Sequence, residues 1–99
     1  MTRLVFAGRL VDDLARIEAH WVAHEIGDRD TRMAEIIDAL QVLMRHPLIG
    51  RKVESGRREL VIGRGARGYI ALYAYDEYDD VVAVAALRGQ REDGFGNAP

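Results

Sequence analysis

The stretch that decides the fold runs from Arg57 to Arg91 and reads RRELVIGRGARGYIALYAYDEYDDVVAVAALRGQR. Three β-prone runs, 58–62, 69–75 and 81–87, are separated by a glycine-rich segment and an acidic segment. Glycines tolerate the positive φ values of a tight reversal, and clustered aspartates favour turns. The first two runs alternate between two faces, whereas the third is an unbroken apolar run typical of a strand covered on both faces. We predict a three-stranded antiparallel meander.

The middle run indicates how this meander is buried. One face carries Tyr69, Tyr73 and Tyr75, and the other carries Ile70 and Leu72. Tyrosines on a strand can stack on nucleobases, but such a row more often packs against neighbouring strands. We therefore favour a packing role for the three tyrosines. A meander with an apolar face needs a second layer, which the first half of the chain should supply.

That first half predicts one strand and two helices. Residues 3–6 (RLVF) are β-prone, and residues 10–26 repeat apolar side chains at helical spacing. Gly27 is the expected residue just past this helix, and Asp28 or Asp30 can cap the next one. The second helix should stop near residue 45, because Pro47 follows. Its apolar positions are Met33, Ile36, Ile37, Leu40, Leu43 and Met44.

The predicted fold class is α+β with the order β-α-α-β-β-β. A helical hairpin should lie on one face of a small, mostly antiparallel sheet, with residues 46–53 as the connector. A chain of 99 residues suits one domain spanning 1–99. Residues 94–99 should be a frayed tail.

Composition narrows the chemistry. The chain has no cysteine, so it can form neither disulfides nor a thiolate zinc site. It has a net charge of −2 and a pI near 5.9, which argues against a binder of nucleic acid that relies on a global positive field. With no signal-like or membrane-spanning run, we expect a soluble, cytoplasmic protein without a membrane partner.

Two clusters could suggest a metal. His20 and His24 stand four residues apart on one helix, but no HExxH pattern or third ligand accompanies them or His46. The acidic segment 76–80 lacks the ligand order of a calcium-binding loop and suits a solvated turn. We therefore predict neither a metal site nor a cofactor.

Arginines at the strand ends are the better functional candidates. Arg64 and Arg67 lie in the GRGARG segment, and Arg88 and Arg91 follow the last apolar run. Their planar forks could form a surface that binds phosphate or carboxylate. Solvated strand ends with local ion pairs explain them equally well. GRGARG itself lacks the strand-to-helix context of a phosphate-binding loop.

Taken together, the order and spacing of these segments resemble the RelE/ParE superfamily of bacterial type II toxins. The resemblance is carried by RELVIGRGARGYIALYAYD, then VVAVAALRGQRE and Gly94-Phe95, with the Pro47-x-x-Gly50 connector before them. It covers essentially the whole chain. It implies the toxin of a plasmid-stabilisation module, which arrests growth and is neutralised by a cognate antitoxin in a hetero-oligomer.

Two mechanisms occur on this fold, and the resemblance implies both as options. RelE-like toxins cleave mRNA on the ribosome, and ParE-like toxins poison DNA gyrase without being nucleases. The arginine that commonly follows Gly-Tyr in the nucleases is replaced by Ile70, whereas Arg91 matches their last arginine. Their C-terminal tyrosine aligns with Phe95, which cannot move a proton. These departures favour the ParE-like reading.

The predicted target-binding residues are Arg64, Arg67, Arg88, Arg91 and Phe95. In the nuclease alternative, Arg67, Arg88 and Arg91 would stabilise the transition state, with the ribosome and mRNA as partners. A third possibility is a degenerate toxin that only binds its antitoxin.

Overall fold

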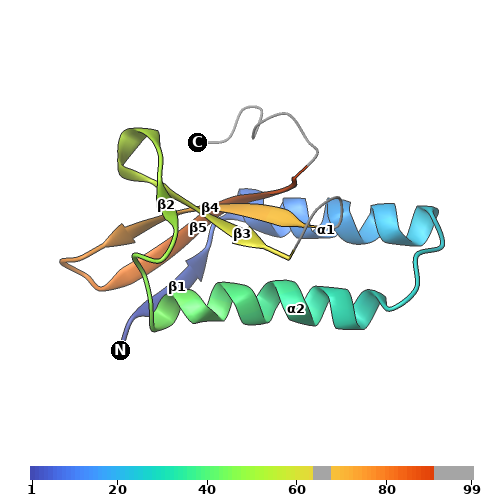
Figure 1. Cartoon of the computed structure of the whole chain (residues 1–99), viewed down its shortest axis with the longest axis horizontal. Coiled ribbons are helices and arrows are strands. Elements are labelled where there is room, and N and C mark those ends of the chain that lie inside the picture. Colours follow the sequence, from blue (N-terminus) through green and yellow to red (C-terminus); the bar gives the residue numbers. More distant parts are fainter. Residues whose placement is uncertain (64–67, 91–99) are drawn as a thin grey trace.

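The computed structural model describes residues 1–63 and 68–90 (Figure 1). These described residues form two long helices, five strands and two short 3₁₀ helices. In chain order they are β1 (Arg3–Phe6), α1 (Gly8–Ala23), α2 (Arg29–Gln41), η1 (Val42–Met44), β2 (Arg51–Lys52), η2 (Glu54–Gly56), β3 (Arg58–Ile62), β4 (Tyr69–Asp76) and β5 (Val81–Gly89).

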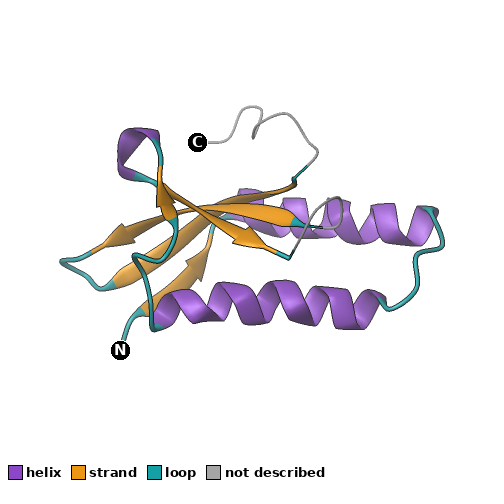
Figure 2. Ribbon diagram, viewed as in Figure 1, coloured by secondary structure: helices purple, strands orange, loops and turns teal. Residues whose placement is uncertain are grey.

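The five strands form one sheet in the order β1-β5-β4-β3-β2. β3, β4 and β5 make the predicted antiparallel meander, β2 adds antiparallel to β3, and β1 runs parallel to β5. The two helices run antiparallel as a hairpin beside the sheet (Figure 2). The α+β prediction is therefore confirmed. The two-residue strand β2 lies in the segment that the sequence indicated only as a connector.

One core joins the helices to the sheet. Its buried members come from α1, α2, η1 and three strands: Leu10, Ile17, Trp21, Ile36, Leu40, Leu43, Ile62, Ala71, Tyr73, Val82, Val84 and Leu87. Tyr69 and Tyr75 pack against it, so the tyrosine face of β4 is the helix side of the sheet. The packing interpretation of the tyrosines is confirmed most clearly at Tyr73, which is 0% exposed.

Helix α1 ends earlier than predicted. His24 is its C-cap, and Glu25, with φ 52°, adopts the left-handed conformation expected two residues later at Gly27. Glu25 N–H donates to Val22 O (3.1 Å), and Ile26 N–H donates to Trp21 O (2.9 Å). This pair of bonds is a Schellman motif. The motif falls here because it lets the apolar Ile26 pack against the core.

Helix α2 begins after Asp28, the N-cap residue, as one of the two predicted options. The predicted capping by a side-chain hydrogen bond is wrong for Asp28, because its side chain forms no such bond and its backbone is left-handed, with φ 58°. The helical stretch continues through η1 to Met44, close to the predicted stop before Pro47.

The prediction that the last strand is covered on both faces is wrong in part. Val82 and Val84 are buried against the helices, but Ala83 is exposed. The register shifts after Leu72, which pairs with Ala86, whereas Tyr73 pairs with Val84, so Ala85 is bulged out of the ladder. Beyond this bulge, the core side of β5 changes from even-numbered to odd-numbered residues.

Candidate functional site

The candidate site lies at one end of the sheet, where β3 ends, β4 begins and β5 ends. Gln90 N–H donates to Gly68 O at 3.0 Å. The Gln90 side chain fills the space beside the Gly68 Cα, so a Cβ on Gly68 would require that side chain to move. Gly63, at the end of β3, has φ 78° and supplies the expected reversal. These residues flank the two segments that carry the other predicted arginines.

Of the predicted site residues, only Arg88 lies in the part of the chain that the structure describes. Arg64, Arg67, Arg91 and Phe95 lie outside the described residues. Arg88 sits opposite Ile70 on β4, which in turn sits opposite Val61 on β3. Its guanidinium donates to Gly89 O at 3.2 Å in a partly buried setting.

The bulge decides which side of the sheet Arg88 occupies. Because Leu87 packs into the core, the next residue points to the opposite, outer face of the sheet. There Arg88 shares a row with Ile70 and with Val61, which is 61% exposed. A guanidinium beside aliphatic side chains can bind an anionic or planar group, but these neighbours provide no proton acceptor.

The tyrosine hydroxyls lie on the other side of the sheet and are engaged there. Tyr69 OH accepts a hydrogen bond from Trp21 Nε1 (3.1 Å), and Tyr73 OH accepts one from Gly50 N–H (2.8 Å). Tyr75 OH donates to Asp80 Oδ1 (2.8 Å). All three rings therefore serve packing and bracing, consistent with their inward face.

The pKa shifts of Tyr73, Tyr75 and Asp80 follow from their burial and their hydrogen bonds. Burial raises the pKa of Tyr73 above its ordinary value. The hydrogen bond to Asp80 raises the pKa of Tyr75. The hydrogen bonds that Asp80 accepts from Thr2 and Tyr75 lower the pKa of that carboxyl group. Both tyrosines thus stay protonated and are poor bases near neutral pH.

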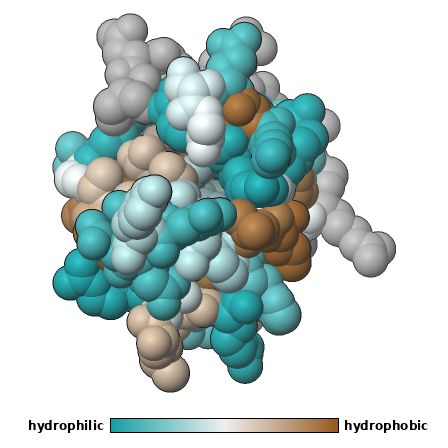
Figure 3. All heavy atoms as spheres, turned by 90° about the vertical axis from the view of Figure 1, so that its left-hand side faces the viewer, coloured by the Kyte–Doolittle hydropathy of each residue, from teal (hydrophilic) through white to brown (hydrophobic). Residues whose placement is uncertain are grey.

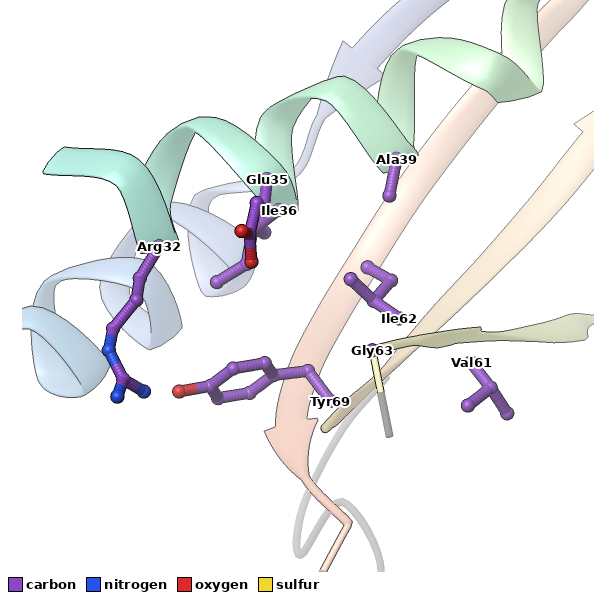
Figure 4. Close-up of a pocket in the computed structure, with 8 residues that line it drawn as sticks. All are labelled: Arg32, Glu35, Ile36, Ala39, Val61, Ile62, Gly63 and Tyr69. Carbon is purple, nitrogen blue, oxygen red and sulfur yellow. The ribbon is translucent and has the colours of Figure 1, made fainter. Parts of the chain in front are cut away.

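A groove lies beside this end of the sheet, between α2 and the end of β3. Its volume is about 590 Å³, and Arg32, Glu35 and Tyr69 supply its polar groups (Figure 4). The Arg32 side chain points toward the Tyr69 hydroxyl. Its Nε is buried and has no hydrogen-bond partner among residues 1–63 and 68–90. The apolar lining is Ile36, Ala39, Val61 and Ile62. Sequence reasoning missed Arg32 and Glu35, because polar residues on an amphipathic helix ordinarily face solvent.

The two clusters considered for metals have other roles. The His20 and His24 rings stack with centroids 4.1 Å apart, and the Asp76 carboxylate accepts N–H bonds from Tyr78 and Asp79 within its turn. Over residues 1–63 and 68–90, no three His, Cys, Asp or Glu side chains are grouped to hold a metal ion.

Comparisons with known proteins agree with this architecture. The structure is similar to a solved chain of the RelBE2 toxin–antitoxin complex from Mycobacterium tuberculosis, with a TM-score of 0.62 and 20% identity over 90% of this chain and 98% of that one. The fold is thus that of RelE/ParE-type toxins. A search of curated proteins found no match.

The sequence identifies the family more closely. Residues 4–94 match the model for the ParE toxin of the type II toxin–antitoxin system parDE. The chain belongs to this family of toxins. In the described part of the chain, no helix is long and apolar enough to cross a membrane.

Proposed function

We propose that this toxin inhibits growth by poisoning DNA gyrase and contacts its target through the segment from Arg88 to Phe95, with Arg64 and Arg67 adding positive charge. The observation that carries the proposal is the chemistry around Arg88. In the part of the chain that the structure describes, its neighbours across the outer face are Ile70 and Val61. The hydroxyls of Tyr69, Tyr73 and Tyr75 lie on the opposite face.

RNA cleavage by the 2′-OH requires a group that takes a proton and a group that offsets phosphorane charge. Arginine can do only the second, because its pKa lies above about 12. Glu59 also lies on the outer face, but its carboxylate is paired with Arg51 at 2.6 Å. A surface that binds without transferring protons suits a toxin that traps another enzyme.

The test combines purified toxin, gyrase and supercoiled plasmid. We expect cleaved plasmid to accumulate after protein denaturation, and Arg88→Ala to reduce that product strongly. Arg29→Ala removes an exposed arginine at the start of α2 and serves as the matched control. Intact plasmid at saturating toxin overturns the proposal.

A ribosome-dependent endoribonuclease is the second candidate, favoured by the position of Arg88 on an accessible sheet face. Arg67, Arg88 and Arg91 would then form its electrostatic group. Incubating the toxin with ribosomes that translate a defined mRNA tests this candidate. Cleavage of the mRNA that disappears in Arg88→Ala supports a nuclease, and intact mRNA contradicts the nuclease proposal. If induced expression of the toxin does not arrest growth, the third possibility is favoured, a degenerate toxin that only binds its antitoxin.

The proposed partner under each candidate is a cognate antitoxin. The similar solved structure is a toxin–antitoxin complex. We propose that the antitoxin wraps an extended segment over the helical hairpin or adds a strand to a sheet edge, and that the pair acts in the cytoplasm. None of these activities requires a cofactor. We expect a small gene beside the toxin gene to encode this antitoxin, and co-expression of that gene should relieve growth arrest.

A further inference from the structure

The connector between α2 and β2 exposes two large aliphatic side chains side by side in the sequence. Leu48 is 53% exposed and Ile49 is 57% exposed. With His46 and Pro47 they line a shallow, mainly apolar depression of about 450 Å³. Single exposed aliphatics are normal, but a contiguous apolar patch marks an interaction site more often. At this end of the molecule, Figure 3 shows a compact apolar area surrounded by hydrophilic residues.

Side chains of β3 and β4 fix the backbone of the connector by hydrogen bonds. The Arg58 guanidinium donates to Leu48 O (3.0 Å) and to Gly50 O (2.8 Å). Gly50 N–H donates to the buried Tyr73 OH (2.8 Å). Three hydrogen bonds thus fix the main chain on both sides of Ile49. A preformed loop loses little conformational entropy on binding, so its apolar side chains are better suited to a partner than those of a loose loop.

The residues that flank the patch in the sequence are mainly basic. Arg45 precedes it, and Arg51 and Lys52 follow it; all three are exposed. Arg51 also pairs with Glu59, but the flanks remain basic in a chain whose net charge is −2. An apolar centre with a basic rim complements an apolar stripe flanked by carboxylates, and such complementarity selects partners and raises association rates.

We propose that this connector patch, Arg45 to Lys52, is a docking site for an acidic amphipathic helix of a partner protein. Apolar side chains of that helix would cover Leu48 and Ile49, and its carboxylates would face Arg45 and Lys52. The connector between α2 and β2 lies toward the other end of the sheet from the C-terminal end of β5, the strand that carries Arg88 (Figure 1). It is therefore separate from the proposed target surface, and the inference holds whichever target the toxin inhibits.

The test titrates the isotope-labelled full chain with a stapled synthetic helix that carries leucines on one face and glutamates beside them. Amide shifts should change mainly over residues 46–53. The double substitution L48S/I49S should weaken binding at least about tenfold, as expected for central apolar contacts. Val22→Ser is the matched control, since Val22 is 55% exposed on α1. It should change affinity by less than about twofold.

Two further measurements test the roles of charge and of the loop backbone in binding. The same helix with lysines in place of glutamates should bind at least about tenfold more weakly. Arg58→Ala keeps both aliphatic side chains but frees the backbone, and it should also weaken binding. Circular dichroism confirms that each variant is folded. Equal binding of the acidic and basic helices, or unchanged binding to folded L48S/I49S, overturns the proposal.

Discussion

Asp13 offers the sharpest test of how the sheet is held at the candidate site. Strand β1 ends opposite Val84, so it does not reach Leu87 of β5. The buried Asp13 carboxylate on α1 takes its place and accepts the Leu87 N–H at 2.9 Å. Arg9 lies 3.5 Å from the same carboxylate, and Arg16 lies 3.9 Å from it. A helix side chain thus replaces the missing strand.

Asp13→Ala should orphan a buried N–H, which costs about 1–3 kcal/mol, and a charged acceptor lies toward the upper end of that range. The ion pair with Arg16 adds little, because the Arg16 side chain is half exposed and lies 3.9 Å from the carboxylate. We expect a loss of about 2–3 kcal/mol, or roughly 10–20 °C in melting temperature for a domain of this size. Asp13→Asn keeps an acceptor oxygen and should lose about 1 kcal/mol.

Chemical and thermal unfolding followed by circular dichroism measures these differences. The neighbouring Asp12 is exposed, so Asp12→Ala is the matched control and should stay within about 0.5 kcal/mol of the parent protein. If Asp13→Ala unfolds at the same denaturant concentration as Asp12→Ala, the carboxylate does not replace the strand and the reasoning fails.

Three other substitutions test separate contacts. Gly50→Ala should destabilise by about 1–3 kcal/mol, because its Cβ would lie 2.7 Å from the buried Tyr73 ring; an unchanged urea midpoint contradicts this. Tyr73→Phe orphans the Gly50 N–H and should cost about 1–3 kcal/mol in the same assay, whereas no loss would mean that water replaces the hydroxyl. Asp80 has a lowered pKa in the folded state, so its stabilising effect is present above about pH 3.8 and is lost as pH falls further. Asp80→Asn should therefore make the free energy of unfolding fall less steeply as the pH is lowered in this acid range. If the pH dependence of the free energy of unfolding is unchanged in Asp80→Asn, the Asp80 carboxylate does not stabilise the fold in this way.

The fold could be read from the sequence because its signals are local. Alternation placed Leu60 and Ile62 on one face of β3 and Val61 on the other, and the structure confirms that placement. Helical spacing identified Leu10, Ile17 and Trp21 as core residues. The ends of the helices were harder to predict from the sequence. Ile26 packs against the core, and the left-handed residue after α1 is Glu25 in place of the expected Gly27.

The candidate site was less accessible to sequence reasoning. Arg88 was singled out by its position after an apolar run, but its face was not predictable. Strict alternation from Val82 and Val84 would have placed Arg88 toward the helices. The bulge at Ala85 shifts that alternation by one residue, and nothing in the local run of alanines marks it. The Arg32 groove was missed because it depends on how α2 lies beside β3.

The bulge and the Asp13 contact act on the same stretch of β5. After the bulge, Leu87 turns into the core and its N–H faces the region beyond the end of β1, where Asp13 accepts it. Leu87 is thereby fixed on both its side chain and its backbone. Its successor, Arg88, must then project to the outer face. The orientation of the proposed target-binding arginine thus depends on Asp13, a helix residue 74 positions before Leu87 in the chain. A substitution at Asp13 that leaves the domain folded should therefore also weaken target binding, although Asp13 does not reach the outer face.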